Sequence, residues 1–293
     1  MGPRYFQTNS PFCLLKVTGE DSFNFLQGQF TADLRPLEAE DSDAVVYGLF
    51  LDNRGKMVAD AYVRRSPEGF LLYGPTVETE VLWQRLDDYL IADEVELEDL
   101  SSSHAVVTTT GEASPDFAAK AYAFPSRRWP PPATDWLFLQ ESGKTLITTL
   151  EEQGFTSATE DEVVKTRVIH QLPRVPQDTG KRLLPQEAGF ENAVCYTKGC
   201  FLGQEVMARF KNFGSRRKGL FPVKLEGSVW PQETPFSVLL GDKKGGEMVS
   251  LAKCSETEAY GFAMLPLNWS DSEATLSIEA GQEVSLTLLN QNA

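Results

Sequence analysis

The sequence predicts an α+β fold that is built from antiparallel sheets and ends in a small barrel or sandwich of strands. Residues 44–74 are rich in β-branched and apolar side chains and are interrupted by turn residues. Residues 102–161 are loop-rich and contain one short strand and one short helix. After residue 215 the chain consists of short apolar runs separated by Gly and Pro, which is typical of an all-β unit.

The first predicted element is a helix within residues 17–34. Asp21 is a candidate N-cap, because its side chain can accept a backbone hydrogen bond at the start of a helix. Phe23, Leu26 and Phe30 follow at the spacing that places them on one helix face, and Gly28 is the expected stop.

Three strands, a helix and a further strand follow. The turns at 52–55 and 66–69 divide residues 44–74 into an antiparallel meander. Leucines four residues apart predict a helix over 79–90, and the alternating residues 93–101 predict a strand.

A capping box marks the next long helix. Thr159 and Glu162 have the spacing in which each side chain bonds the backbone of the other residue, and Pro173 is expected to close the helix. The chain has 293 residues, enough for two or three domains. The expected domains are an α+β domain of residues 1–101 plus 162–214, an inserted small α+β domain of residues 102–161, and a C-terminal domain of residues 215–293.

Composition narrows the classes of partner. The net charge of −15 and the pI near 4.7 disfavour direct binding of nucleic acid, which depends on cations that neutralise phosphates. The four cations in residues 210–219 form either a solvated connector or a rim that faces an anion. No apolar run reaches the length of a membrane span and no targeting segment is recognised, so we expect a cytoplasmic protein with no membrane partner.

The segment Lys198–Glu205, KGCFLGQE, concentrates reactive residue types. Gly199 and Gly203 flank Cys200, and a helix that starts after Gly203 would favour its thiolate, as would Lys198. The alternative is a cysteine that serves as a small buried hydrophobe. His104 and His170 are the only candidate bases for a Cys–His pair, and spacing does not place either beside Cys200.

The four cysteines do not suggest a disulfide framework, which indicates a reducing compartment. Cys195 and Cys200 are spaced C-x4-C, and no CxxC or HExxH is present, so no structural zinc site is expected. An iron–sulfur cluster held by all four cysteines is a remaining alternative.

KGCFLGQE resembles the K-G-C-[YF]-x-G-Q-E signature of the YgfZ family, which consists of folate-binding proteins related to the aminomethyltransferase of the glycine cleavage system. Residues 17–34 resemble its V-x-G-x-D-x-x-x-F-L-Q-G segment, and residues 49–63 and 183–194 resemble its following motifs. Cys200 and Gln204 differ from the usual aminomethyltransferase residues. Gln171 stands where the family often has Gly.

The resemblance implies an aminomethyltransferase-like fold of three domains, with a C-terminal β-barrel, around a central channel. It implies tetrahydrofolate or a one-carbon derivative as cofactor. The implied function is an accessory role in iron–sulfur cluster assembly or repair, with an indirect effect on tRNA modification. Iron–sulfur proteins or cluster-assembly factors are the implied partners of a monomer. The alternatives are a tetrahydrofolate-dependent aminomethyltransferase or other one-carbon transferase, and a scaffold that binds no folate.

The expected site residues follow from the same resemblance and from their chemistry. Cys200 is the expected catalytic thiol. Asp99 is either an acid near the reacting group or a residue that bonds local backbone at a strand exit. The cations near the Cys motif, Arg209, Lys211, Arg216 and Arg217, suit the anionic tail of folate. The expected cofactor-binding residues are Glu187, Asn192, Lys198, Gly199, Gly203, Gln204, Glu205 and Arg209, and no metal ligand is expected.

Overall fold

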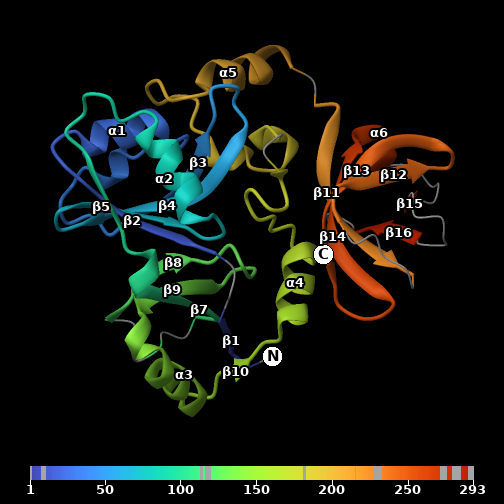
Figure 1. Cartoon of the computed structure of the whole chain (residues 1–293), viewed down its shortest axis with the longest axis horizontal. Coiled ribbons are helices and arrows are strands. Elements are labelled where there is room, and N and C mark those ends of the chain that lie inside the picture. The colour runs from blue at the N-terminus through green and yellow to red at the C-terminus, as the bar shows by residue number, and fades with distance from the viewer. Residues whose placement is uncertain are drawn as a thin grey trace.

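The computed structural model describes residues 2–7, 11–112, 115, 120–180, 183–214, 216–227, 233–270, 276–278 and 285–289. Two five-stranded sheets and one closed barrel form its three parts (Figure 1). The sheets lie side by side in one half of the molecule and the barrel forms the other half. The predicted α+β class and the three-part fold are therefore confirmed.

The first sheet contains the predicted meander. Its strands run in the order β3 (Val45–Leu51), β4 (Met57–Ser66), β5 (Gly69–Gly74), β2 (Cys13–Thr18) and β6 (Glu96–Asp99), and every pairing is antiparallel. Apolar side chains of these strands share one core with the helices α1 (Ser22–Gln29) and α2 (Thr79–Asp87). Burial of that face fixes the register, because a slip by one residue would turn every apolar side chain outward.

The helix predicted near Asp21 is present, but its ends differ from the prediction. The Asp21 carboxylate accepts the backbone N–H of Glu94 at 2.9 Å and does not cap α1. The helix continues through Gly28 to Gln29 and ends where Phe30 becomes extended. Packing of Phe25 and Leu26 in the core therefore outweighs the weak helix preference of one glycine.

The second sheet includes the N-terminal strand. Its order is β10 (Thr156–Ser157), β1 (Arg4–Gln7), β7 (His104–Thr110), β9 (Ala133–Leu139) and β8 (Tyr122–Pro125). The sequence placed residues 1–101 together, whereas β1 pairs with β7 and β10 of the inserted unit. The helix α3 (Gly143–Glu152) covers this sheet through Leu146 and Leu150.

A buried polar seam joins the two sheets. The Tyr73 hydroxyl on β5 donates to Asp135 Oδ2 on β9 at 2.8 Å, and the Thr108 hydroxyl donates to Asp135 Oδ1 at 2.7 Å. Arg128 Nη2 donates to the Tyr73 hydroxyl at 3.3 Å. These contacts supply partners for polar groups that would otherwise be costly to bury.

The C-terminal part is a barrel rather than a sandwich. Six strands close in the order β11 (Lys218–Glu226), β14 (Glu258–Pro266), β13 (Lys243–Lys253), β12 (Phe236–Leu240), β15 (Leu276–Ile278) and β16 (Ser285–Leu288). The short helix α6 (Leu267–Ser270) places Trp269 in the barrel core.

One helix connects the sheets to the barrel. α4 (Glu160–Ile169) lies between the second sheet and the barrel (Figure 1), and its Val168 packs with Tyr260 and Phe262 of β14. The predicted capping box is present, because the Glu162 N–H donates to Thr159 Oγ1 at 3.2 Å and the Thr159 N–H donates to Glu162 Oε2 at 2.8 Å.

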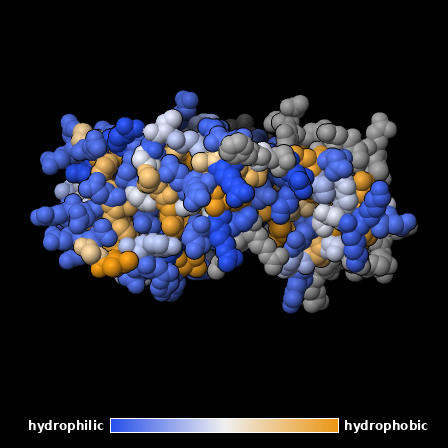
Figure 2. Space-filling view, turned by 90° about the horizontal axis from the view of Figure 1, so that it is seen from above, coloured by the Kyte–Doolittle hydropathy of each residue, from blue (hydrophilic) through white to orange (hydrophobic). Residues whose placement is uncertain are grey.

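The visible surface is mostly hydrophilic. Seen from above, hydrophobic residues appear in small separate patches among hydrophilic ones (Figure 2). Within the described ranges, no helix is long and apolar enough to cross a membrane.

Candidate functional site

The loop of residues 195–203, here called the Cys loop, is fastened to the end of α1. The Cys195 N–H donates to the Thr31 carbonyl at 2.9 Å, and the Leu202 N–H donates to the Gly28 carbonyl at 3.0 Å. Gly203 then adopts φ +85°, and a Cβ there would lie 3.0 Å from the Asp52 carbonyl oxygen. Glycine is therefore needed at this position, where the helix α5 (Gln204–Phe213) begins.

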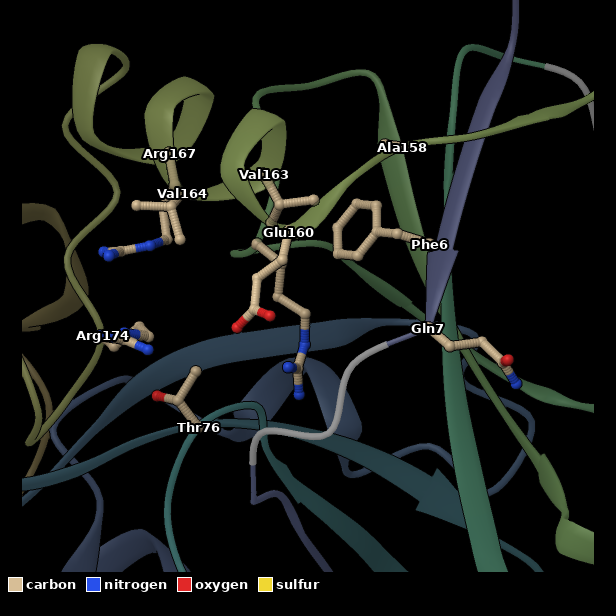
Figure 3. Close-up of a pocket in the computed structure, with 10 residues that line it drawn as sticks. Phe6, Gln7, Thr76, Ala158, Glu160, Val163, Val164, Arg167 and Arg174 are labelled. Atoms are coloured by element: carbon tan, nitrogen blue, oxygen red, sulfur yellow. The ribbon is translucent and has the colours of Figure 1, made fainter. Parts of the chain in front are cut away.

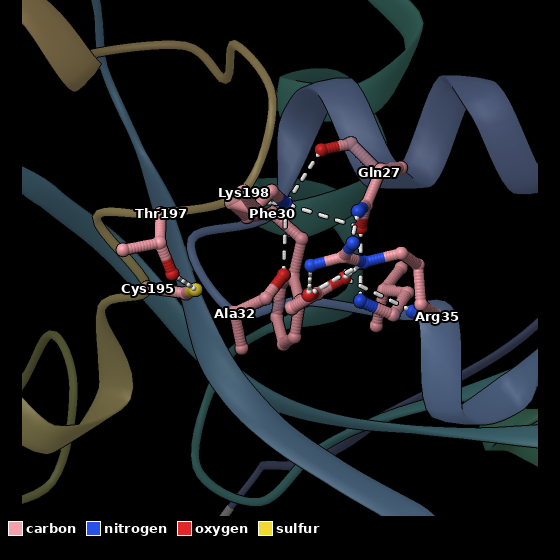
Figure 4. Close-up of polar contacts among 9 residues, drawn as sticks. Gln27, Phe30, Ala32, Arg35, Cys195, Thr197 and Lys198 are labelled. Carbon is pink, nitrogen blue, oxygen red and sulfur yellow. Dashed lines mark hydrogen bonds and ion pairs between the residues drawn. The ribbon is translucent and has the colours of Figure 1, made fainter.

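Lys198 holds the middle of the Cys loop. Its Nζ donates to the carbonyl oxygens of Gln27 at 2.7 Å, Phe30 at 2.7 Å and Ala32 at 2.8 Å (Figure 4). The side chain is buried, and burial lowers the pKa of its ammonium to about 8. The sequence assigned Lys198 to the cofactor and to the thiolate of Cys200, whereas its ammonium binds carbonyls at and just after the end of α1.

Cys200 is an exposed free thiol. This contradicts the alternative in which it is a small buried hydrophobe. Cys195, five residues earlier, is half-buried, and its Sγ lies 3.5 Å from Thr197 Oγ1. The Thr197 side chain lowers the Cys195 pKa, and the backbone N–H groups of Thr197 and Lys198 act in the same direction.

The other two cysteines lie elsewhere. Cys13 is buried in β2, and burial raises its pKa to about 12. Cys254 lies beside α4, with its Sγ 3.9 Å from the Asp161 carbonyl oxygen. Across the part of the chain that the structure describes, no three His, Cys, Asp or Glu side chains gather as metal ligands. The alternative of one cluster held by all four cysteines is therefore wrong for this arrangement.

The rest of the motif packs on the turn between β3 and β4. Met207 of α5 is fully buried, and its methyl group lies 2.8 Å from the position that a Cβ on Gly55 would take. Gln204 is half-buried, and Glu205 and Arg209 are exposed. Figure 1 shows α5 above the ends of β3 and β4, away from α4. The Cys motif thus lies at the outer tip of the first sheet.

Two cavities lie near the centre of the molecule, where α4 meets the sheets and the barrel. The first has a volume of about 260 Å³, and Arg167 and Arg174 lie at one end of it while Phe6 and Val163 lie toward the other (Figure 3). Its lining residues are Phe6, Gln7, Thr76, Arg128, Ala158, Glu160, Val163, Val164, Arg167 and Arg174.

The second cavity has a volume of about 280 Å³. Its lining residues are Arg127, Gln171, Pro173, Ala188, Gly189, Arg216, Leu220, Pro222 and Phe262. Arg127 and Pro173 line this second cavity. The residues that follow each of them in the sequence, Arg128 and Arg174, line the first. The two cavities therefore flank the same two segments of chain.

An ion-pair cluster fixes the wall that the cavities share. Asp178 is fully buried, and its Oδ2 accepts from Arg167 Nη1 and from the Arg174 backbone N–H at 2.7 Å. Although burial raises the pKa of Asp178, the charges of Arg167 and Arg174 outweigh burial and hold the pKa below its ordinary value. This cluster sets the path of residues 171–174 between the cavities.

The structure also presents an acid that the sequence analysis missed. Asp60 of β4 is 1% exposed, and its Oδ2 accepts from the Tyr47 hydroxyl at 2.8 Å. Its Oδ1 has no hydrogen-bond partner among the described residues, and neither has Nε of Arg127, which lines the second cavity. Burial raises the Asp60 pKa, which is a common property of functional acids. The available signal was a lone carboxylate within the apolar run 57–63.

Asp99 occupies the structural position that the sequence analysis allowed. It is exposed at the end of β6, and its Oδ1 accepts the Ser101 N–H at 2.8 Å. Asp99 lines neither central cavity. Asp99 instead lines a separate open pocket of about 520 Å³, together with Glu80 and Ser101, so its catalytic assignment stays a prediction.

The other predicted contacts are dispersed. Glu187 is buried beside the second cavity, but its Oε2 accepts the Leu184 N–H at 2.9 Å. Asn192 is exposed.

Among the cations proposed for the folate tail, Arg216 lines the second cavity, whereas Arg209 and Arg217 are exposed and line neither. Lys211 lies over the Tyr196 ring, 4.0 Å from its centroid.

Comparison with known proteins gives a consistent set of relatives. No family model matches the chain. It is 25% identical to the tRNA-modifying protein YgfZ of Photobacterium profundum, over 86% of this chain and 80% of that protein. It is 30% identical to the mitochondrial iron–sulfur cluster assembly factor IBA57 of Mus musculus, over 74% of this chain and 65% of that protein.

A solved structure shares the whole fold. The glycine cleavage system aminomethyltransferase T of Bartonella henselae superposes with a TM-score of 0.79 over 99% of this chain and 85% of its own. Sequence identity in that superposition is 14%, so the likeness supports the fold alone.

Proposed function

We propose that the chain, which is similar to YgfZ proteins over most of its length, is a member of the YgfZ family and a tetrahydrofolate-binding accessory protein for iron–sulfur cluster assembly or repair. An effect on tRNA modification would then be indirect. The observation that carries this proposal is the position of Cys200, which is exposed on a fastened loop and lines neither central cavity. A thiol placed there meets a docked protein rather than a molecule held in the cavities.

We place tetrahydrofolate, or a one-carbon derivative of it, at the central cavities. Phe262, Leu220 and Pro222 supply an apolar wall in the second cavity, and Arg127 and Gln171 supply hydrogen-bond donors. That mixture suits a planar ring with several polar atoms. Arg216 at the same cavity is half-exposed and suits an anionic tail that extends toward solvent.

Each cavity alone is smaller than the roughly 300–1,000 Å³ typical of sites for drug-sized ligands. The ligand would therefore leave its tail outside the second cavity or displace side chains toward the first. Of the other predicted contacts, Glu187 stays in the proposal because it precedes the cavity residues Ala188 and Gly189. Gly199, Gly203, Gln204, Glu205 and Asn192 line neither cavity, so we propose them as part of the surface around the Cys loop.

Complementation tests the accessory role. In a bacterium that lacks its own YgfZ, we expect the wild-type chain to restore the activity of iron–sulfur enzymes and Cys200→Ser to fail. Cys254→Ser is the matched control, because it removes a thiol that is distant from the Cys loop. Full restoration by Cys200→Ser would remove the thiol from the proposal.

A one-carbon transferase is the second candidate, and Asp60 favours it. A buried carboxylate with one unpartnered oxygen and a raised pKa resembles a catalytic acid or base. Under this alternative, purified protein would transfer a one-carbon group from a methylamine donor to tetrahydrofolate, and Asp60→Asn would abolish the transfer. The accessory role predicts no transfer by either protein.

We further propose that the protein acts as a cytoplasmic monomer and that its partners are iron–sulfur proteins or cluster-assembly factors. The names of its relatives support an iron–sulfur partner. Size-exclusion chromatography with light scattering tests the monomer, since a dimer would elute at twice the mass of 32.6 kDa.

A further inference from the structure

The Cys loop is short and contains two thiols, those of Cys195 and Cys200. The loop is fixed at Cys195 by Thr31 and at Leu202 by Gly28, and the two acceptors are only three residues apart on one segment. The two ends of the loop are therefore held close together beside the end of α1. Cys195 lies at its start and Cys200 lies just before its end.

The backbone between the two cysteines bends at each of residues 196–199. Lys198 draws the middle of the loop toward α1, and a Cβ placed on Gly199 would meet no atom within 4 Å. The segment next to Cys200 thus has open space in which to move. A disulfide needs Cα atoms about 4.4–6.8 Å apart, a separation that a bent chain of this length reaches with local adjustment.

Cys195 has surroundings that favour a thiolate. Its Sγ contacts Thr197 Oγ1, and the charges of Lys198 and Arg35 interact favourably with it, while Asp33 opposes them. Figure 4 shows Cys195, Thr197 and Lys198 on the loop and Arg35 on the segment that follows α1. The arrangement resembles the electropositive, partly exposed settings of reactive cysteines.

The two thiols differ in access. Cys200 is exposed and meets a soluble oxidant first, whereas Cys195, at the start of the same loop, is half-buried. Cys13 is fully buried, and Cys254 is held beside α4, on a different part of the molecule. Cys195 is therefore the thiol best placed to react with an oxidised Cys200.

We propose that Cys195 is the resolving thiol of Cys200 and that the two form a reversible intramolecular disulfide when a hydroperoxide oxidises Cys200. The Cys200 thiolate attacks the O–O bond, becomes a sulfenic acid and releases water or an alcohol. The Cys195 thiolate then attacks the Cys200 sulfur, forms the S–S bond and releases a second water. A dithiol reductant restores both thiols. The inference extends the proposed role of Cys200 and does not depend on folate binding.

Peroxide treatment of the reduced full-length protein tests this inference. We expect free thiols to fall from four to two, the intact mass to fall by two hydrogen atoms, and dithiothreitol to reverse both changes. Trypsin cleaves after Lys198, so the disulfide would appear as two linked peptides that contain Cys195 and Cys200.

Matched variants separate the outcomes. In Cys195→Ser we expect Cys200 to proceed to sulfinic acid or to form intermolecular dimers, whereas Cys254→Ser should form the internal disulfide as the wild type does. Thr197→Val keeps both thiols and should slow the reaction without preventing it. If wild type and Cys195→Ser give the same products, the inference is wrong.

Complementation distinguishes failure of the disulfide inference from failure of the proposed role of Cys200. Cys195→Ser that shows no internal disulfide but restores iron–sulfur enzymes fully would leave the role of Cys200 intact and remove Cys195 from it. If Cys200→Ser instead complements as well as the wild type does, the proposed role of Cys200 is removed, even if the wild-type protein forms the disulfide.

Discussion

Lys198 Nζ lies 2.7 Å from the carbonyl oxygen of Phe30, a residue that is 168 positions earlier in the chain. Through this contact the Cys loop is fixed to the first sheet at the end of α1. The loop that presents Cys200 is therefore part of the folded core rather than a free surface segment, although the thiol itself is exposed.

Replacing Lys198 tests that anchor. Lys198→Met leaves the carbonyls of Gln27, Phe30 and Ala32 without their ammonium donor. Since an unsatisfied buried polar group costs about 1–3 kcal/mol, we expect the free energy of unfolding to fall by about 2–4 kcal/mol. Urea denaturation measures this change, and Lys144→Met, at an exposed position on α3, is the control. A change below about 0.5 kcal/mol, typical of surface substitutions, would show that the anchor is unimportant.

Asp178 is expected to support the wall between the cavities. Asp178→Asn leaves Arg167 buried without its counter-charge, so we expect a loss of about 3–5 kcal/mol in unfolding free energy. Glu226→Gln, which changes an exposed ion pair in the barrel, should cost less than about 1 kcal/mol.

The same aspartate predicts an acid dependence. Its pKa is lower in the folded than in the unfolded protein, so its stabilisation is present above the unfolded value of about 3.9 and is lost as pH falls through the folded value. Thermal melting of wild type and Asp178→Asn from pH 7 downward should converge below about pH 4. A constant difference between the two across that range would contradict the assignment.

The cysteines should differ in their reactivity toward iodoacetamide. Because its pKa is lowered, Cys195 holds more thiolate at neutral pH than an ordinary cysteine, so its alkylation should reach half-maximal rate below the usual cysteine midpoint of about 8.5. Cys13, whose pKa is raised to about 12 by burial, should remain unmodified in the folded protein. Site-resolved mass spectrometry measures both rates, and Cys195→Ser should lose the low-pH component. Equal rates at Cys195 and Cys13 would contradict the geometry of the loop.

The elements that local sequence patterns encode were predictable. The meander of residues 44–74, the Thr159–Glu162 capping box and the C-terminal strands each depend on residues that are close in sequence. The position of β1 was not predictable, because its pairing with β7 joins residues about one hundred positions apart. Long-range pairings of this kind leave no local pattern.

The site was predictable only in part. The motif identified Cys200, and the structure shows it exposed, but the motif gave no indication that Lys198 binds carbonyls at and just after the end of α1. Asp60 was missed because a single carboxylate in a strand resembles an outward-facing residue until the neighbouring sheet is placed over it. The cavities depend on Arg127, Arg128 and residues 171–174, which meet only in the folded chain.

The most direct test of the central claim is a calorimetric titration of tetrahydrofolate into wild type, Arg216→Ala and Arg209→Ala. Both variants remove one arginine, but only Arg216 lines the second cavity. The account predicts micromolar binding by wild type, about tenfold weaker binding by Arg216→Ala, which corresponds to about 1.4 kcal/mol, and unchanged binding by Arg209→Ala. No binding by wild type at high micromolar ligand, or equal loss in the two variants, would contradict a folate site at the central cavities.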